Sequence, residues 1–149
     1  MLARTRAVVY VLAAGPVLAL MLPHAAPAIE VRRADTVSLD GPWAFRFAPD
    51  DRGTTEGWFT PAAPFDRRVT VPGCWDAQGI GPPTDKMRHN AVGVGWYRRS
   101  FRLPDTWRGR RVWLTVGGAH RSVRIWLNGK PCGEHLGYPG AHRVEITAM

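Results

Sequence analysis

The segment VRIWLNG at residues 123–129 decides the fold of this chain. Its apolar residues Val123, Ile125 and Leu127 stand at every second position, so an extended backbone turns all three to one face of a sheet. The segment ends in Asn128-Gly129, a pair that tolerates the positive φ angles of a type I′ turn. We therefore predict a strand over residues 123–128 that folds back through a tight hairpin onto a strand beginning near Lys130.

The same alternation runs through the rest of the chain, and no stretch repeats apolar residues with helical spacing over three turns. Reversals are predicted at Gly117-Gly118 and Pro104-Asp105. Each predicted strand has one apolar face and one face that carries Arg or Trp, as in antiparallel sheets with a solvated side. These features predict an all-β fold packed as a β-sandwich. The other alternating apolar positions are Trp43, Phe45, Phe47, Val69, Val71, Tyr97, Phe101, Leu103, Val112, Leu114 and Val116.

Length and composition limit the classes of protein that remain. The chain has 149 residues, of which 45% are hydrophobic and 21% charged, with 16 Gly, 13 Pro and 2 Cys. This composition excludes a disordered tail, a collagen-like repeat and a disulfide-stapled miniprotein. The length allows one domain of roughly 100–150 residues. It excludes a (β/α)₈ barrel, which needs about 250 residues.

The chain is basic, with 20 Lys+Arg against 12 Asp+Glu and a formal net charge of +8. All the basic residues except Lys86 and Lys130 are arginines, and they are spread singly or in pairs without a basic run. That distribution favours a solvated arginine-rich face over a nucleic-acid-binding surface. We therefore expect no nucleic-acid partner.

The first 28 residues have the pattern of an export signal. Arginines near the start precede an uncharged, mostly apolar run over residues 7–22, and Ala26-Pro27-Ala28 offers the small residues that signal peptidase requires. The alternative is an uncleaved membrane anchor, which needs roughly 20 apolar residues, whereas this run is shorter and interrupted by Gly15-Pro16. We expect cleavage after Ala28, no stable membrane insertion, a secreted or periplasmic protein, and a folded domain over residues 29–149.

Four motifs follow one another in the remaining chain: LDGPWAF at residues 39–45, VPGCW at 71–75, GWYRRSF at 95–101 and VRIWLNG at 123–129. In this order and spacing they resemble the N-terminal sugar-binding domain of glycoside hydrolase family 2. That family comprises β-galactosidases, β-glucuronidases and β-mannosidases. The similarity covers nearly all of the chain after the export signal, and it implies a jelly-roll β-sandwich of the galactose-binding type.

The resemblance also implies that further domains belong to the whole enzyme. In the family, this domain precedes an immunoglobulin-like sandwich and a catalytic barrel that holds the two glutamates of a retaining mechanism. The chain stops where the family continues into one more long strand, so we expect a sandwich that is incomplete at its C-terminal end. We expect a non-catalytic carbohydrate-binding and scaffolding domain of an exported β-galactosidase or β-glucuronidase, with carbohydrate and the missing domains as partners. The alternative is a free-standing secreted carbohydrate-binding module.

The long loop between Gly73 and Gly95 contains the candidate sugar-binding residues. A sugar site needs a flat aromatic side chain under the apolar face of the ring, and planar polar groups that bond paired hydroxyls. The resemblance implies that loops of this domain help the barrel to hold the sugar. The alternative is that the polar residues brace the loop while Trp75 and Trp96 pack in the core. The candidates are Trp75, Asp76, Asp85, Arg88, His89 and Asn90.

No other group of residues forms a catalytic or metal-binding motif. Ser122 with His120 lacks both a nucleophile elbow and a placed carboxylate. The spacing of His120, His135 and His142 fits no compact metal-ligand motif. We therefore expect no catalytic residue, no metal and no cofactor in this chain.

Cys74 and Cys132 leave two arrangements open. Export would expose both thiols to oxidising conditions, under which they could form a bridge. Nothing in the strand pattern forces them together, so two separate, small buried thiols are the other arrangement.

Overall fold

The computed structural model describes residues 6–8, 35–83, 91–119, 121–137 and 140–148. The strands are β1 (Arg6–Val8), β2 (Gly41–Ala48), β3 (Arg67–Val71), β4 (Val94–Ser100), β5 (Trp113–Val116), β6 (Ser122–Leu127), β7 (Lys130–Leu136) and β8 (His142–Glu145). The helical elements are short: α1 (Arg52–Thr55), η1 (Asp76–Gln78) and η2 (Asp105–Trp107). None of the helices in these ranges is long and apolar enough to cross a membrane.

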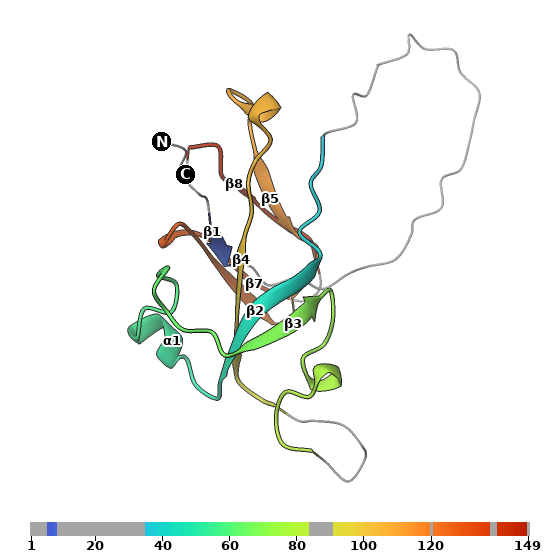
Figure 1. Cartoon of the computed structure of the whole chain (residues 1–149), viewed down its shortest axis with the longest axis vertical. Helices are drawn as coiled ribbons and strands as arrows, with labels where there is room; N and C mark the ends of the chain where they lie inside the picture. Colours follow the sequence, from blue (N-terminus) through green and yellow to red (C-terminus); the bar gives the residue numbers. More distant parts are fainter. Residues whose placement is uncertain (1–5, 9–34, 84–90, 120, 138–139, 149) are drawn as a thin grey trace, which may run out of the picture.

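The strands form two antiparallel sheets (Figure 1). The larger sheet has the order β3-β2-β4-β1-β6-β7, and the smaller pairs β5 with β8. The core lies between them, where apolar side chains of β2, β4 and β6 pack with Leu114 and Val116 of β5. The predicted all-β sandwich is therefore confirmed. Its largest fully buried side chains in this core are Trp43, Phe45, Ile125, Leu127, Val71 and Val116.

The hairpin predicted from VRIWLNG is present. β6 and β7 pair antiparallel, and Leu127 stands opposite Lys130 at the turn. Asn128 and Gly129 have φ angles of 54° and 81°, as the two central positions of a type I′ turn require. Val123, Ile125 and Leu127 are all buried in the core, so the alternation placed the apolar face of this strand correctly.

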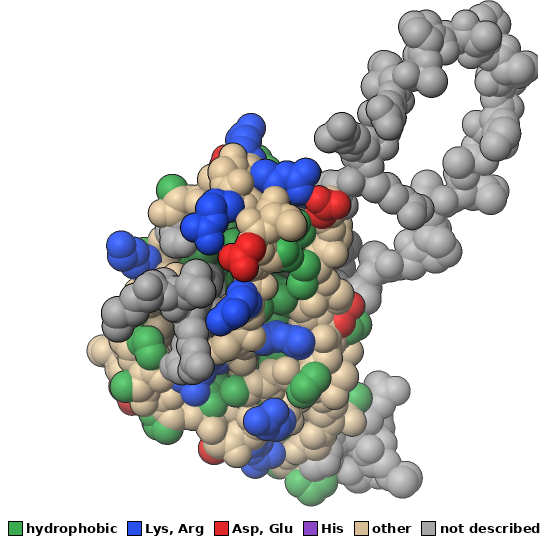
Figure 2. Space-filling model, turned by 45° about the horizontal axis from the view of Figure 1, so that its top comes forward, with side chains coloured by type: hydrophobic (Ala, Val, Ile, Leu, Met, Phe, Trp, Pro, Cys, Tyr) green, Lys and Arg blue, Asp and Glu red, His purple; other side chains and the backbone are tan. Residues whose placement is uncertain are grey.

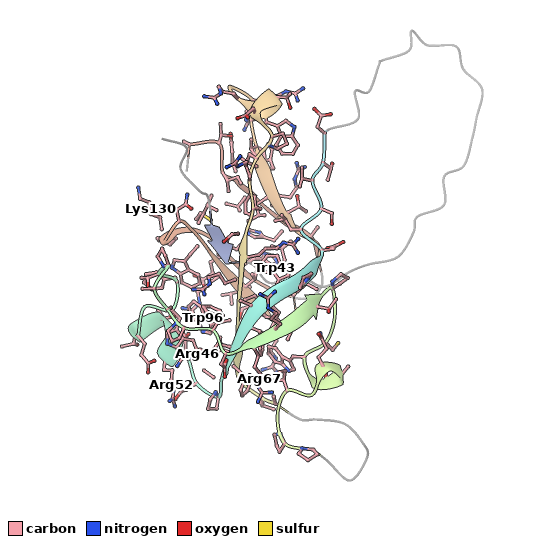
Figure 3. The ribbon with its side chains drawn as sticks, viewed as in Figure 1. Trp43, Arg46, Arg52, Arg67, Trp96 and Lys130 are labelled. Atoms are coloured by element: carbon pink, nitrogen blue, oxygen red, sulfur yellow. The ribbon has the colours of Figure 1, made fainter. Side chains whose placement is uncertain are left out.

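The outer face of the larger sheet is covered, whereas the sequence pattern predicted a solvated face of Arg and Trp. Residues 49–65 fold over it, and Trp96 (Figure 3) and Trp126 are only 0% and 7% exposed. Trp58 of this covering segment packs edge-on against Trp96 with ring centroids 5.9 Å apart. Phe59 stacks on Trp126 at 5.6 Å. The molecule thus has a second, aromatic core outside the sandwich.

Three arginines of the outer face hold the covering segment in place. The Arg46 guanidinium lies 3.6 Å from the centroid of the Trp58 ring. Arg98 donates a hydrogen bond of 2.7 Å to a backbone carbonyl of the segment, and Arg124 pairs with Asp51. These side chains are half-buried, so they are structural, unlike the solvated arginines that we predicted. Figure 2 shows Lys and Arg side chains distributed over the face that it draws.

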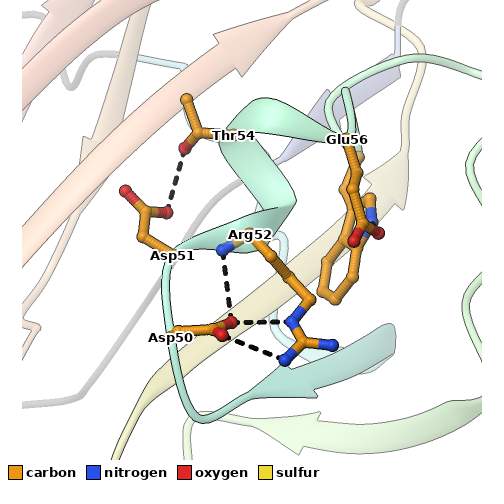
Figure 4. A network of polar contacts seen from close by, with 6 residues as sticks. Asp50, Asp51, Arg52, Thr54 and Glu56 are labelled. Carbon is orange, nitrogen blue, oxygen red and sulfur yellow. Dashed lines mark hydrogen bonds and ion pairs between the residues drawn. The ribbon is translucent and has the colours of Figure 1, made fainter.

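A polar network fixes the start of α1 within the covering segment (Figure 4). Arg52 donates to the two carboxylate oxygens of Asp50 at 2.7 and 2.9 Å, and this hydrogen bonding lowers the pKa of Asp50. The Thr54 hydroxyl donates to Asp51 at 2.9 Å. Between them the backbone of Gly53 lies against Trp96, since a Cβ there would stand 2.4 Å from the indole. Only glycine allows this close approach.

The larger sheet includes a segment that the sequence pattern assigned to the export signal. β1 lies between β4 and β6, with Ala7 opposite Arg99 on one side and Leu127 on the other. In this structure Arg6–Val8 therefore belongs to the sheet, which differs from the expectation that residues 1–28 lie outside the fold. An apolar run suits both an export signal and an interior strand, so sequence alone does not separate the two. Cleavage after Ala28 stays a prediction.

Removing residues 1–28 is expected to lower the solubility and the melting temperature of the chain. The deletion takes β1 out and exposes the backbone N–H and C=O groups of β4 and β6 that it pairs. Size-exclusion chromatography and thermal melts of the full chain and of residues 29–149, both made without export, measure the effect. A monomeric, equally stable shorter chain would show that β1 is dispensable.

Replacing Trp96 by Ala is expected to destabilise the protein by about 3–5 kcal/mol, because it empties the middle of the aromatic core. The matched control is Trp113→Ala, which removes an indole that is 41% exposed and should cost about 0.5 kcal/mol or less. Urea unfolding followed by circular dichroism gives both values. Similar small losses in the two variants would mean that residues 49–65 do not form a core with the sheet.

Candidate functional site

The candidate sugar-binding loop follows β3, and the structure describes its residues 73–83 and 91–95. Asp85, Arg88, His89 and Asn90 lie outside the described residues, so their contact with sugar stays a prediction. Trp75 and Asp76 lie among the described residues.

Trp75 packs against the sandwich. Its ring lies 6.2 Å from that of Phe45 and 5.9 Å from that of Phe47, in tilted and edge-on geometry. Gly95 of β4 makes room for it, since a Cβ at that position would stand 2.5 Å from the indole. Trp75 is half-buried and anchors the start of the loop to the core. These contacts are those of a loop-packing residue, which was the alternative to a sugar platform.

Asp76 begins the short helix η1, directly after Trp75. Its backbone carbonyl accepts a hydrogen bond of 3.3 Å from Gly79, whose φ of 79° ends the turn in the left-handed region. The Asp76 side chain is half-buried. The turn brings Ile80 back into the core, where it is buried, so this part of the loop is tied to the sandwich at both ends.

Gln78 clamps the loop to β3, the edge strand of the larger sheet. Its amide oxygen accepts a hydrogen bond of 2.6 Å from the Thr70 N–H. Its Nε2 donates to the carbonyls of Thr70 at 3.0 Å and Cys74 at 3.2 Å. The side chain thus continues the hydrogen-bond ladder as a neighbouring strand would. Sequence reasoning missed Gln78, because a single Gln in a loop carries no pattern.

Both cysteines are thiols, and they do not form a disulfide. Cys74 is exposed, whereas Cys132 is half-buried and burial raises the pKa of its thiol. Burial, together with the nearby Cys74, raises the pKa of Tyr97 to about 12. The Tyr97 hydroxyl beside the loop is therefore protonated at neutral pH and is unsuited to act as a general base.

Two of the three histidines considered as metal ligands meet in space. His135 of β7 and His142 of β8 stack with ring centroids 5.0 Å apart and an interplanar angle of 19°. His120 lies outside the described residues. Within the described ranges, no three His, Cys, Asp or Glu side chains gather as a metal site would require.

The described carboxylates that form ion pairs all pair with arginine. A general acid that works near neutral pH needs a raised pKa, whereas the hydrogen bond from Arg111 lowers the pKa of Glu145 to about 2 and that from Arg52 lowers the pKa of Asp50. These two carboxyl groups are therefore ionised at neutral pH. The pairs are Asp35–Arg110, Asp50–Arg52, Asp51–Arg124, Asp105–Arg108 and Glu145–Arg111.

Comparison with known proteins agrees with the sequence motifs. The family model described as "Glycosyl hydrolases family 2, sugar binding domain" matches residues 36–149. The β-glucuronidase of Bacteroides fragilis is 31% identical over 122 residues, which cover 81% of this chain and 15% of that protein. The β-galactosidase of Priestia megaterium is 26% identical over 121 residues, which cover 68% of this chain and 11% of that protein.

Among solved structures too, this chain is similar to one part of a larger protein. The β-glucuronidase from Ruminococcus gnavus in complex with D-glucuronic acid matches with a TM-score of 0.64 and 27% sequence identity. The match covers 75% of this chain and 19% of that structure. The chain thus corresponds to less than a fifth of each of these proteins.

Replacing Gln78 by Glu is expected to destabilise the loop by about 1–3 kcal/mol, because the carboxylate cannot donate to the two carbonyls that Nε2 now serves. Amide hydrogen exchange of residues 70–80 measures local opening, and faster exchange should be confined to this segment. Asp76→Asn is the control, since no described hydrogen bond uses the Asp76 side chain. Unchanged exchange in the Gln78 variant would contradict the clamp.

Proposed function

We propose, since this chain belongs to the sugar-binding domain family of the family 2 glycosyl hydrolases, that it serves as the non-catalytic N-terminal domain of an exported family 2 glycosidase. The proposal is carried by the family match over residues 36–149. The matched relatives are much longer proteins, and this chain spans only 11–18% of their length. A domain that corresponds to so small a part of an enzyme works together with the parts that it does not contain.

The activity of the whole enzyme is proposed to be hydrolysis of β-glucuronides or β-galactosides. Relatives named β-glucuronidase and β-galactosidase support these two substrate classes. A retaining mechanism needs two carboxyl groups about 5–5.5 Å apart, one of them with a raised pKa. The described carboxyl groups with a resolved pKa shift, Asp50 and Glu145, are both shifted downward, which supports a supply of the acid with the raised pKa by another domain.

The role of this domain is then structural support and carbohydrate contact. The clamp by Gln78 and the packing of Trp75 hold the base of the loop rigidly on the sandwich. A rigid base can present the residues of the loop, among them Asp85 and Arg88, to a sugar bound by a neighbouring domain. The export pattern of residues 1–28 supports a secreted or periplasmic enzyme.

Two measurements test the proposal. The purified 149-residue chain, first shown by circular dichroism to be folded, is expected not to turn over the para-nitrophenyl β-glucuronide or β-galactoside. Sequencing of the transcript beyond codon 149 is expected to continue in frame into a barrel domain. Turnover that survives rigorous purification would contradict the non-catalytic role. A stop codon with no barrel sequence downstream would instead favour a free-standing carbohydrate-binding module.

A further inference from the structure

The smaller sheet carries an exposed group of side chains that the proposed function does not use. We call it the Trp113 face: Trp113 and Thr115 of β5, Arg143 and Glu145 of β8, and Arg111 two residues before β5, all of them exposed. The sheet's alternate residues Leu114 and Val116 turn into the core. In Figure 1 these strands lie at the upper end of the molecule and the loop after β3 at the lower end. The Trp113 face is therefore separate from the candidate loop.

Trp113 is unusual among the tryptophans of this chain because it is 41% exposed. Four others, Trp43, Trp58, Trp96 and Trp126, are buried in the two cores. An indole left on the outer face of a sheet exposes a large apolar surface with one polar N–H. No hydrogen bond between described residues uses that N–H. Arg111 and Arg143 both lie over this ring, and the part of the indole that stays exposed is open to a ligand with an apolar and a polar side.

Arg111 is held beside Trp113 by a fixed network. Its Cζ lies 5.1 Å from the centroid of the indole, and its Nε and NH2 donate to Glu145 at 3.1 and 2.7 Å. Thr147 donates a further hydrogen bond of 2.8 Å to the same carboxylate. Glu145 stands opposite Trp113 in the strand pair, and its carboxylate neutralises the charge of Arg111 beside the indole.

Arg143 also lies near the Trp113 indole, and no described carboxylate forms an ion pair with it. Its Cζ lies 5.2 Å from the ring centroid, and it stands opposite Thr115 on β5. Within the described residues Arg143 forms no ion pair. The Trp113 face therefore presents an aromatic surface, an exposed hydroxyl and one guanidinium whose charge is not neutralised by a protein carboxylate.

We propose that the Trp113 face binds a uronate unit of an anionic glycan. The apolar C–H face of the sugar ring lies on the exposed part of the indole, the carboxylate accepts two hydrogen bonds from the Arg143 guanidinium, and the Thr115 hydroxyl bonds a neighbouring sugar hydroxyl. This site rests on the proposed function in one respect, namely that carbohydrate is the class of ligand.

The combination favours a uronate over a neutral sugar or a polyphosphate. A neutral sugar would use the indole and leave the charge of Arg143 without an anion. A nucleic acid needs a series of basic side chains along its backbone, whereas Arg111 of this face is already paired with Glu145. A uronate has one carboxylate, which pairs with the Arg143 guanidinium, and one sugar ring, which packs on the Trp113 indole.

The test is calorimetric titration of the full chain with an oligogalacturonate. Trp113→Ala and Arg143→Gln are each expected to weaken binding by about tenfold or more. Arg108→Gln removes the same charge from a guanidinium that is 78% exposed just after η2, and it should weaken binding by less than about twofold. Arg143→Lys should restore only part of the affinity, since an ammonium group cannot form the paired hydrogen bonds. Thermal melts of each variant confirm folding.

Three results would overturn the site. The first is the absence of binding to the oligogalacturonate by the unmodified chain. The second is an equal loss of affinity in the Arg108 and Arg143 variants, which would indicate attraction by net charge alone. The third is unchanged affinity in Trp113→Ala. Each of these results leaves the proposed function standing, because that proposal is tested separately by turnover and by the transcript.

Discussion

β4 is buried on both of its faces, and the rest of the structure is arranged around this constraint. Tyr97 points into the sandwich core and Trp96 into the aromatic core on the other side. A strand with two buried faces needs a covering layer on each. The small β5–β8 sheet supplies one layer, and residues 49–65 supply the other. The half-buried Arg46, Arg98 and Arg124 join the second layer to the sheet, so the basic composition of the chain is partly a structural feature.

The packing around β4 also fixes the base of the candidate sugar-binding loop. Gly95 of β4 lets Trp75 pack onto the core, and Gln78 fastens the following turn to β3. The loop therefore starts from a rigid base. Hydrogen bonds from Arg52 and Arg111 lower the pKa values of Asp50 and Glu145. The Trp113 face is the part of the described structure with an exposed aromatic ring and a cation that no protein carboxylate neutralises.

Much of the sandwich could be predicted from the sequence, because alternation reports directly which side chains share a face. The VRIWLNG segment predicted both the strand of β6 and the turn at Asn128-Gly129, which the φ angles confirm. The cover over Trp96 and Trp126 could not be predicted in this way, since residues 49–65 form turns and one short helix without a strand period. Gln78 acts through a single side-chain amide, which leaves no periodic signal. Arg6–Val8 lies in an apolar run that fits an export signal as well as a strand.

Native-state hydrogen exchange of the full chain tests most directly whether β4 is the centre of the structure. If β4 is the centre, the backbone amides of Tyr97 and Arg98 exchange through global unfolding only, and amides of the edge strands β3 and β7 exchange faster through local opening. Exchange from β4 that is as fast as exchange from β3 and β7 would contradict the account, because it would show that the two covering layers are not fixed to this strand.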